Sequence, residues 1–399
     1  MIMRRLLFVD DEVPILRALE RMLRAHRSQW ECHFADDPMQ ALSLIETLAP
    51  DAVVSDMLMP GLDGAEFLME AAARRPHMAR FILSGEVGAG SLVRMARAAH
   101  QCLAKPCRGD LLMDVLRRAL IAPDAVREPA LLSGLYGLRS LPVSAPAYDA
   151  VRRLLGQPSS EARDREAVAV IARAPAIATK LLQVATWTRL GIGAPPLHVH
   201  DAYFQLGPDA VCALLDSDLL KPVPGSETTA FQGETWRRAG RASTVARVLA
   251  DAEGLGADEA RQVALVALWS TAAPLLLDIC CRDAYAEVRA TAVAGGADLA
   301  AAERARFGLT AGEAFAQMLR LWGLSPLLAD RVAEAGDPAA LDDASPDRAL
   351  PHLARLVADA VDDGAHQTVL DASLARTGRG ARLPEWKALA VDVLEPLAV

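Results

Sequence analysis

Five residues near the start of the chain have side chains and spacing suited to phosphoryl chemistry. Asp10, Asp11, Asp56, Ser84 and Lys105 each follow a short apolar run. Carboxylates that share a crevice repel one another unless a hard divalent cation lies among them, and Mg2+ prefers such oxygen ligands. Lys105 adds a point charge that can pair with an anionic oxygen, and Ser84 adds a hydroxyl. The set predicts phosphoryl transfer onto a carboxylate, with Asp56 as the nucleophile.

The elements that must position these residues alternate between strand-like and helix-like segments over residues 1–122. Five such repeats predict an α/β doubly wound, five-stranded parallel sheet covered on both faces. The carboxyl ends of parallel strands meet at one edge, so the acids, the hydroxyl and the lysine should meet there. The predicted strands are 6–9, 30–34, 52–55, 81–83 and 102–104, and the predicted helices are 13–27, 38–48 (with Asp37 as N-cap), 65–73, 91–99 and 110–120.

Each residue also has an ordinary structural explanation. Asp10 and Asp11 alone would be read as helix caps, and Lys105 alone as a surface charge. Their joint occurrence at strand ends, in chain order, favours a site.

Residues 1–122 resemble the receiver domain of two-component response regulators. The resemblance implies that Asp56 accepts a phosphoryl group from a sensor histidine kinase. It also implies that Mg2+ is bound by Asp11, Asp56 and the backbone carbonyl of Leu58, while Asp10 contacts the ion through water. The matching stretches are Leu7-Phe8-Val9-Asp10-Asp11-Glu12, Val53-Val54-Ser55-Asp56-Met57-Leu58-Met59-Pro60-Gly61-Leu62-Asp63-Gly64, Ile82-Leu83-Ser84-Gly85 and Leu103-Ala104-Lys105-Pro106.

The same resemblance assigns the switch residues. Ser84 would be the hydroxyl that moves toward the phosphate, Lys105 would pair with the phosphate, and the Lys105–Pro106 bond would be cis. Receivers usually carry Tyr or Phe three residues before this lysine, but here the position is Cys102. Cysteine lacks the bulk of a ring, so Ser84 and the fourth helix would have to carry the signal.

The remainder of the chain reads as helical. Residues 123–135 contain Pro123, Pro129 and Gly134 and predict a linker that is partly helical. Residues 336–399 form a predicted helical extension that either completes the helical core or makes a subdomain. The predicted helices are 147–155, 163–173, 176–188, 235–252, 257–272, 311–321 and 328–335, followed by 350–361 and 388–397.

Five mostly apolar, helical stretches characterise the second half of the chain: Leu138-Arg139-Ser140-Leu141-Pro142, Pro175-Ala176-Ile177-Ala178-Thr179-Lys180-Leu181-Leu182-Gln183-Val184-Ala185, Ala202-Tyr203-Phe204-Gln205-Leu206-Gly207, Glu303-Arg304-Ala305-Arg306-Phe307-Gly308 and Leu321-Trp322-Gly323-Leu324. Through these stretches, residues 136–335 are similar to the HDOD domain, a relative of the HD-type metal phosphohydrolases that lacks their catalytic residues. The resemblance implies an all-α helical output module. Thr186 and Tyr203 depart from the usual pattern, which has Asn and a small aliphatic residue.

The residues that would hold a catalytic metal are sparse in this region. An HD hydrolase needs at least two His and two Asp, but only His198 and His200 occur here. Trp269-Ser270-Thr271 replaces the His-Asp dipeptide, and Ala239 and Ala311 stand at two other usual His positions. We therefore expect a protein that is not an enzyme and relays its signal by protein–protein interaction. The alternative is an HD-type metal-dependent phosphohydrolase of nucleotides or cyclic nucleotides, regulated by the receiver.

His200-Asp201 is a literal His-Asp pair that must be weighed as a metal site. It follows Pro195-Pro196 in a predicted loop, where Asp201 would be the N-cap of a helix starting at Ala202. A loop pair lacks the third and fourth ligands, so capping is favoured. Separately, Trp236, Trp269 and Trp322 lie in apolar helical patterns and predict core packing.

Charge and cysteine usage narrow the partners and the compartment. Of the net charge of −9, residues 123–399 carry −8, which opposes nucleic-acid binding. Six scattered cysteines without a CxxC suit a reduced, cytoplasmic protein. The uncharged run 263–277 is too short to span a membrane and contains Pro274, so it predicts a buried core helix. The expected partners are a sensor histidine kinase, an unknown downstream protein and a possible second copy, paired through the fourth helix, fifth strand and fifth helix.

Overall fold

A computed structural model of the chain describes residues 3–85, 89–120, 125–188, 195–222, 229–295, 298–336, 344–362 and 367–395. The chain divides into two compact units. The first comprises Met1–Arg139, Gln183–Pro195 and Arg320–Leu324, and the second comprises Ser140–Leu182, Pro196–Leu319 and Ser325–Val399.

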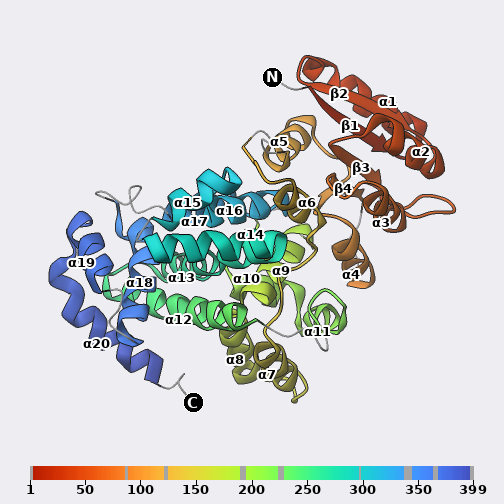
Figure 1. Ribbon diagram of the computed structural model, residues 1–399. Coiled ribbons are helices and arrows are strands. Elements are labelled where there is room, and N and C mark those ends of the chain that lie inside the picture. The colour runs from red at the N-terminus through yellow and green to blue at the C-terminus, as the bar shows by residue number, and fades with distance from the viewer. Residues whose placement is uncertain are drawn as a thin grey trace. The chain divides into compact units, whose positions relative to one another are not determined.

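The first unit contains a five-stranded parallel sheet, which confirms the predicted fold (Figure 1). The strand order is β2-β1-β3-β4-β5, with β3 and β4 buried along their whole length. In this register Asp56 pairs with Leu83, and Ser84 pairs with Ala104. The ends of β3, β4 and β5 therefore lie side by side. The strands are β1 Arg4–Val9, β2 Trp30–Ala35, β3 Ala52–Asp56, β4 Ala79–Ser84 and β5 Gln101–Ala104.

Five helices alternate with these strands. The Asp37 side chain accepts a hydrogen bond from the Gln40 N–H at 2.7 Å, so the predicted N-cap is confirmed. The first helix is shorter than predicted, because residues 24–26 form a 3-10 turn after it ends. The helices are α1 Val13–Leu23, α2 Pro38–Leu48, α3 Gly64–Arg74, α4 Ala89–Ala98 and α5 Gly109–Ala119.

The segment predicted as a linker contains a helix, α6 (Pro129–Gly137), which is anchored within the first unit. His100 is buried, and its Nδ1 accepts a hydrogen bond from the Arg80 N–H at 2.9 Å. Its Nε2 therefore carries the proton and can donate to the carbonyl oxygen of Tyr136, also at 2.9 Å. Burial, with a smaller contribution from nearby Arg139, lowers the pKa of Arg80 to about 10. A buried polar network thus joins the start of β4 to the end of α6.

In the described parts of residues 145–394 the regular secondary structure is helical, as the sequence predicted. The sequence analysis missed α11, α14, α15 and α19. The last three lack a clear apolar stripe, whereas α11 has one (Val211, Leu214 and Leu215) but is only nine residues long. The helices are α7 Ala145–Leu155, α8 Glu161–Ile171, α9 Pro175–Thr188, α10 Val199–Leu206, α11 Pro208–Asp216, α12 Ala230–Ala252, α13 Ala257–Ala272, α14 Pro274–Gly295, α15 Leu299–Phe307, α16 Ala311–Leu321, α17 Pro326–Ala335, α18 Pro346–Asp362, α19 Gln367–Arg376, the 3-10 helix η3 Gly380–Arg382 and α20 Leu383–Leu394.

The beginning of α10 differs from the prediction. The helix starts at Val199, with His198 at the extended N-cap position (φ −138°, ψ 148°). Asp201 therefore lies inside the first turn, and its predicted role as N-cap is wrong. A carboxylate in the first turn is still favourable, because it faces the positive end of the helix dipole.

Among the described residues, the helical run 257–294 is long and apolar enough to cross a membrane, and the pair of helices 161–171 and 175–188, bent by 111°, passes only if the two count as one span. Of the most apolar window of the run 257–294, 72% is buried inside the fold. A break at Ala273 separates α13 from α14, as expected from Pro274. Burial among other helices is the signature of a core helix, as the sequence predicted.

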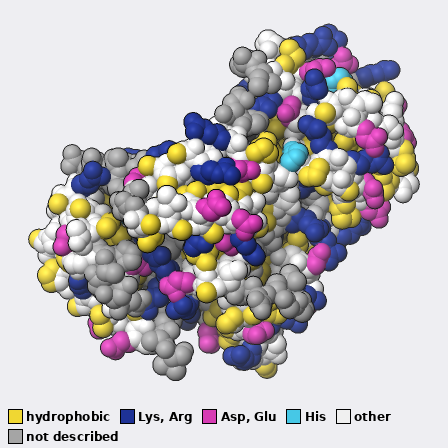
Figure 2. Space-filling model, viewed as in Figure 1, with side chains coloured by type: hydrophobic (Ala, Val, Ile, Leu, Met, Phe, Trp, Pro, Cys, Tyr) yellow, Lys and Arg dark blue, Asp and Glu magenta, His cyan; other side chains and the backbone are white. Residues whose placement is uncertain are grey.

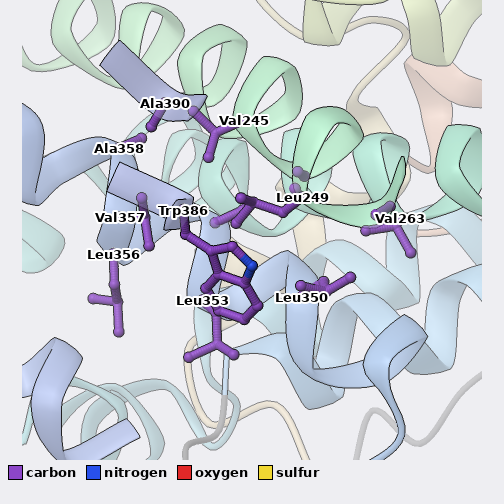
Figure 3. Close-up of a cluster of buried hydrophobic side chains, with 14 of the residues drawn as sticks. Val245, Leu249, Val263, Leu350, Leu353, Leu356, Val357, Ala358, Trp386 and Ala390 are labelled. Carbon is purple, nitrogen blue, oxygen red and sulfur yellow. The ribbon is translucent and has the colours of Figure 1, made fainter. Parts of the chain in front are cut away.

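The C-terminal helices complete the core of the second unit and do not form a separate subdomain. Figure 3 shows Trp386 of α20 surrounded by Leu249 of α12 and by Leu350 and Leu353 of α18. All four side chains are fully buried. Polar contacts reinforce this packing. Arg238 of α12 donates two hydrogen bonds to Asp359 of α18, at 3.0 and 2.6 Å.

Candidate functional site

The first unit brings Asp10, Asp56 and Lys105 together at the carboxyl edge of its sheet. Lys105 Nζ lies 2.7 Å from Asp10 Oδ2 and also forms an ion pair with Asp56 Oδ1. The two aspartates are almost fully buried, and the lysine side chain is 21% exposed. One ammonium thus holds both carboxylates, which places their oxygens near enough to share a cation.

Backbone groups fix the orientation of each carboxylate. Asp56 Oδ2 accepts a hydrogen bond from the Leu58 N–H at 2.8 Å. Asp10 Oδ1 accepts one from the Glu12 N–H at 3.0 Å. Because Leu58 is bonded to Asp56 in this way, its backbone lies beside the nucleophile, while its side chain is 79% exposed.

Burial opposes the charge on Lys105, but the hydrogen bonds to Asp10 and Asp56 outweigh it and raise the pKa of the ammonium. The lysine is therefore a permanent cation at neutral pH. It can move its bond from Asp56 to a new anionic oxygen without a change in protonation.

The remaining predicted site residues lie close in the fold but differ in their contacts. Ser84 is buried at the end of β4, and its carbonyl accepts a hydrogen bond from the Lys105 N–H at 2.8 Å. The Lys105–Pro106 bond is cis, as predicted. Asp11 is exposed and has no part in the Lys105 ion pairs.

The donors of this edge fit Mg2+ chemically. Asp10, Asp11, Asp56 and the Leu58 carbonyl supply the hard oxygen ligands that the ion prefers. Lys105 occupies the place between two of the carboxylates that a cation would take. Among the described residues, no group of three or more His, Cys, Asp or Glu side chains is already arranged to hold a metal. Mg2+ would therefore compete with the Lys105 ammonium for these carboxylates.

Two residues of the site loop gain a role that the sequence analysis did not give them. A side chain at Gly64 would collide with the backbone oxygen of Asp56, so only glycine allows α3 to start this close to the nucleophile. Asp63 caps α3 through the N–H groups of Ala65 and Glu66 and also pairs with Arg94 of α4. The loop after Asp56 is therefore connected to α4. The Asp63-Gly64 dipeptide just before an apolar helical pattern was the available signal.

Cys102, at the position usually taken by an aromatic ring, lies inside the sheet. It is buried and pairs with Ile82 in the strand register. Burial raises the pKa of its thiol, so it remains a neutral, apolar side chain. It can pack but cannot swing a ring between two positions.

In the second unit, Trp269 and Ala239, where the sequence analysis expected an HD hydrolase to place metal ligands, lie in the core. Trp269 is fully buried, and its indole N–H donates to Thr179 Oγ1 at 2.8 Å. Ala239 is also fully buried. Trp269 and Trp322 confirm the predicted core packing, whereas Trp236 is only half-buried.

A buried acidic residue of this unit has a structural role as well. Glu303 of α15 is buried and accepts hydrogen bonds from the Tyr285 hydroxyl at 3.1 Å and from the Ala311 N–H at 2.7 Å. Burial, opposed by these bonds, raises the pKa of its carboxyl. Glu303 therefore ties α14, α15 and α16 together.

Comparison with known families finds two matches. A model of the response regulator receiver domain matches residues 6–117, and a model of the HDOD domain matches residues 141–338. These ranges agree with the regions that carried the two resemblances. The linker limits and the start of the C-terminal extension stay predictions.

Curated relatives share segments of the chain. Protein-glutamate methylesterase/protein-glutamine glutaminase 1 of Anaeromyxobacter dehalogenans is 33% identical over 143 residues, which is 35% of this chain and 40% of the relative. The hydrogenase transcriptional regulatory protein HoxA of Cupriavidus necator is 32% identical over 118 residues, or 29% and 24%. The chain thus spans less than half the length of these relatives.

Two solved structures are similar to parts of this chain. A signal receiver domain of an HD domain-containing protein from Pseudomonas fluorescens Pf-5 is 28% identical, covers 30% of this chain and 95% of its own, and has a TM-score of 0.29. The MmoQ response regulator of Methylococcus capsulatus strain Bath is 23% identical, with coverage of 62% and 98% and a TM-score of 0.47.

Proposed function

Because this chain combines a response regulator receiver domain with an HDOD domain, we propose that it is a phosphorylation-controlled response regulator of a two-component phosphorelay. The observation that carries the proposal is the pairing of Lys105 with both Asp10 and Asp56 at the sheet edge. This arrangement offers a carboxylate nucleophile, a permanent cation and oxygen donors in one place.

The proposed step is transfer from a phosphohistidine of a sensor histidine kinase to Asp56. An electron pair of a carboxylate oxygen attacks phosphorus, a P–O bond forms, and the P–N bond breaks with its electrons returning to the imidazole. Mg2+, when bound by Asp11, Asp56 and the Leu58 carbonyl, with Asp10 acting through water, would neutralise charge on the transferring group.

The chain's own residues then hold the product. Lys105 exchanges its ion pair with Asp56 for one with a phosphoryl oxygen. The Ser84 hydroxyl donates a second hydrogen bond to the phosphoryl group. The negative charge of the phosphoryl group changes the conformation of the loop after Asp56. The Asp63–Arg94 ion pair connects this loop to α4 and can pass the change on to that helix. Cys102 contributes packing only. A movement of α4 therefore takes the place of the Tyr or Phe ring movement that is usual in receivers.

We propose that the HDOD domain is a non-catalytic output that acts by protein–protein contact, in the cytoplasm, on a downstream partner. Support comes from Trp269 and Ala239, which fill the core where metal ligands would be needed. Figure 2 shows acidic and basic side chains interspersed on the viewed face, without a continuous basic stripe there. This distribution favours a protein partner over nucleic acid.

The test is capture of partners from a lysate of the source cell by the full-length protein with a beryllofluoride phosphate mimic and Mg2+. Wild type should retain a partner that it does not retain without the mimic. Asp56→Ala should retain none under either condition. Equal capture by wild type and Asp56→Ala, with and without the mimic, would contradict control by phosphorylation.

A further inference from the structure

A cavity of about 450 Å3 lies between α8, α10, α12 and α13, wholly within the second unit. It has no part in the phosphoryl site, and the sequence analysis did not foresee it. Apolar side chains form part of its wall, namely Val168, Val199, Val248 and Leu265. Its size is in the range of small-molecule sites in proteins.

Four arginines line the same cavity: Arg165, Arg173, Arg247 and Arg261. They come from α8, the residues that follow it, α12 and α13. The lining contains no Asp or Glu. Four positive charges around an apolar cavity, inside a unit whose net charge is negative, indicate a binding site for an anion.

The carboxylates that pair with these arginines lie outside the cavity and are exposed. Arg247 pairs with Asp251 at 3.3 Å, and the Asp251 side chain is 52% exposed. Arg261 pairs with Asp258 at 3.1 Å, and Asp258 is 73% exposed. Exposed ion pairs contribute little to stability, so these guanidinium groups can turn toward a ligand at small cost. In the described part of the chain, no carboxylate forms an ion pair with Arg173.

The buried side chain of His198 independently indicates a ligand-binding site. It lines the cavity, is 6% exposed, and its Nδ1 has no hydrogen-bond partner in the described structure. Its Nε2 is 3.6 Å from Asp258, too far for a good hydrogen bond. The Nε nitrogen of Arg261 is likewise buried without a partner. Buried polar atoms are rarely left unsatisfied, so two at one cavity need an explanation.

We propose that this cavity binds a small organic phosphate ester, with its apolar body against Val168, Val248 and Leu265 and its phosphate held by Arg173, Arg247 and Arg261. Planar guanidinium forks match phosphate oxygens and bind them in pairs. A dianion needs more than one cation, and here α12, α13 and the turn after α8 each supply one. A polar group of the ester would satisfy His198. The module would then respond to a metabolite independently of Asp56.

The experiment uses the full-length protein and an anionic fluorophore, 1-anilinonaphthalene-8-sulfonate, as reporter of the cavity. Phenyl phosphate is used to displace the reporter. Phenol and inorganic phosphate, which each carry one half of the ester, are tested in the same way for comparison. The variants are Arg173→Gln/Arg247→Gln, which removes two anchors, and Ala169→Trp, which fills the cavity from an exposed position. Arg237→Gln, an exposed arginine of α12 outside the cavity, is the matched control.

Phenyl phosphate should displace the reporter at least tenfold more tightly than phenol or inorganic phosphate. The double variant should lose at least tenfold in that affinity, Ala169→Trp should bind neither reporter nor ester there, and Arg237→Gln should match wild type. Circular dichroism confirms that each variant is folded. Displacement by phenol as strong as by phenyl phosphate, or unchanged affinity in the double variant, would overturn the proposal. Asp56→Ala should bind phenyl phosphate like wild type, which separates this site from the phosphoryl site.

Discussion

His352 of α18 should make the stability of the second unit depend steeply on pH. The ring is buried, with Nδ1 3.1 Å from the Ala335 carbonyl and Nε2 3.3 Å from Ser373 Oγ. It thus bridges α17, α18 and α19. Burial first, and then the charge of Arg355, lower its pKa from 6.5 to about 3, against a small opposing effect of the Ala335 carbonyl. The folded protein therefore resists protonation of this ring.

The direction of the effect follows from which state binds protons. Below pH 6.5 the unfolded chain takes up a proton that the folded chain refuses, so acid favours unfolding. The contribution of His352 is complete above pH 6.5 and is lost as the pH falls toward 3. Between pH 7 and pH 5, one histidine with these two pKa values costs about 2 kcal/mol of unfolding free energy.

The assay is urea unfolding of wild type and His352→Gln at pH 7 and pH 5, followed by circular dichroism. The difference between the two pH values should be about 2 kcal/mol smaller in His352→Gln than in wild type. Ser373→Ala is the matched control, because it removes a hydrogen-bond partner but leaves the histidine buried. It should lower stability at both pH values and keep the wild-type pH dependence. An identical pH dependence in wild type and His352→Gln would refute the reasoning.

Three further predictions test the packing and the site. Trp386→Ala removes a fully buried ring from the cluster in Figure 3 and should destabilise the second unit by about 3–5 kcal/mol in urea unfolding. A loss below about 1 kcal/mol would mean that the C-terminal helices are not part of the core. Gly64→Ala forces a methyl group against the Asp56 backbone and should cost about 1–3 kcal/mol and slow phosphorylation by acetyl phosphate. Gly85→Ala, which meets open space, is its control, and equal effects of the two would count against the steric argument. Lys105→Ala should bind Mg2+ more tightly than wild type in a fluorescence or calorimetric titration, because the competing ammonium is gone; weaker binding would contradict the assigned competition.

The fold of the first unit could be predicted closely because its local signals agree. Short apolar runs ended by acids or by Ser84 gave the strands, and Asp37 gave the start of a helix. The parallel arrangement then placed the strand ends together without further information. What the sequence could not show was that Lys105 already lies between Asp10 and Asp56, since side-chain contacts depend on the fold.

The helical unit was predicted less completely, for a physical reason. Helices buried on several sides lose the apolar stripe on which sequence reasoning depends, and the first half of α14 is of this kind. α15 was missed because it is short and mostly exposed, with Glu303 and Phe307 as its buried residues. The start of α10 was misplaced because His198, a poor capping residue, holds the N-cap position. The Arg-lined cavity joins residues that are up to about a hundred positions apart, and no local pattern reveals such a site.

The most direct measurement is the location of the phosphoryl group after incubation of the full-length protein with acetyl phosphate and Mg2+. Peptide mass spectrometry after borohydride reduction of the acyl phosphate should place the label on the peptide that contains residue 56. The label should be lost with EDTA and in Asp56→Ala. Labelling that persists in Asp56→Ala, or no labelling of wild type by either acetyl phosphate or a kinase, would contradict the signalling account.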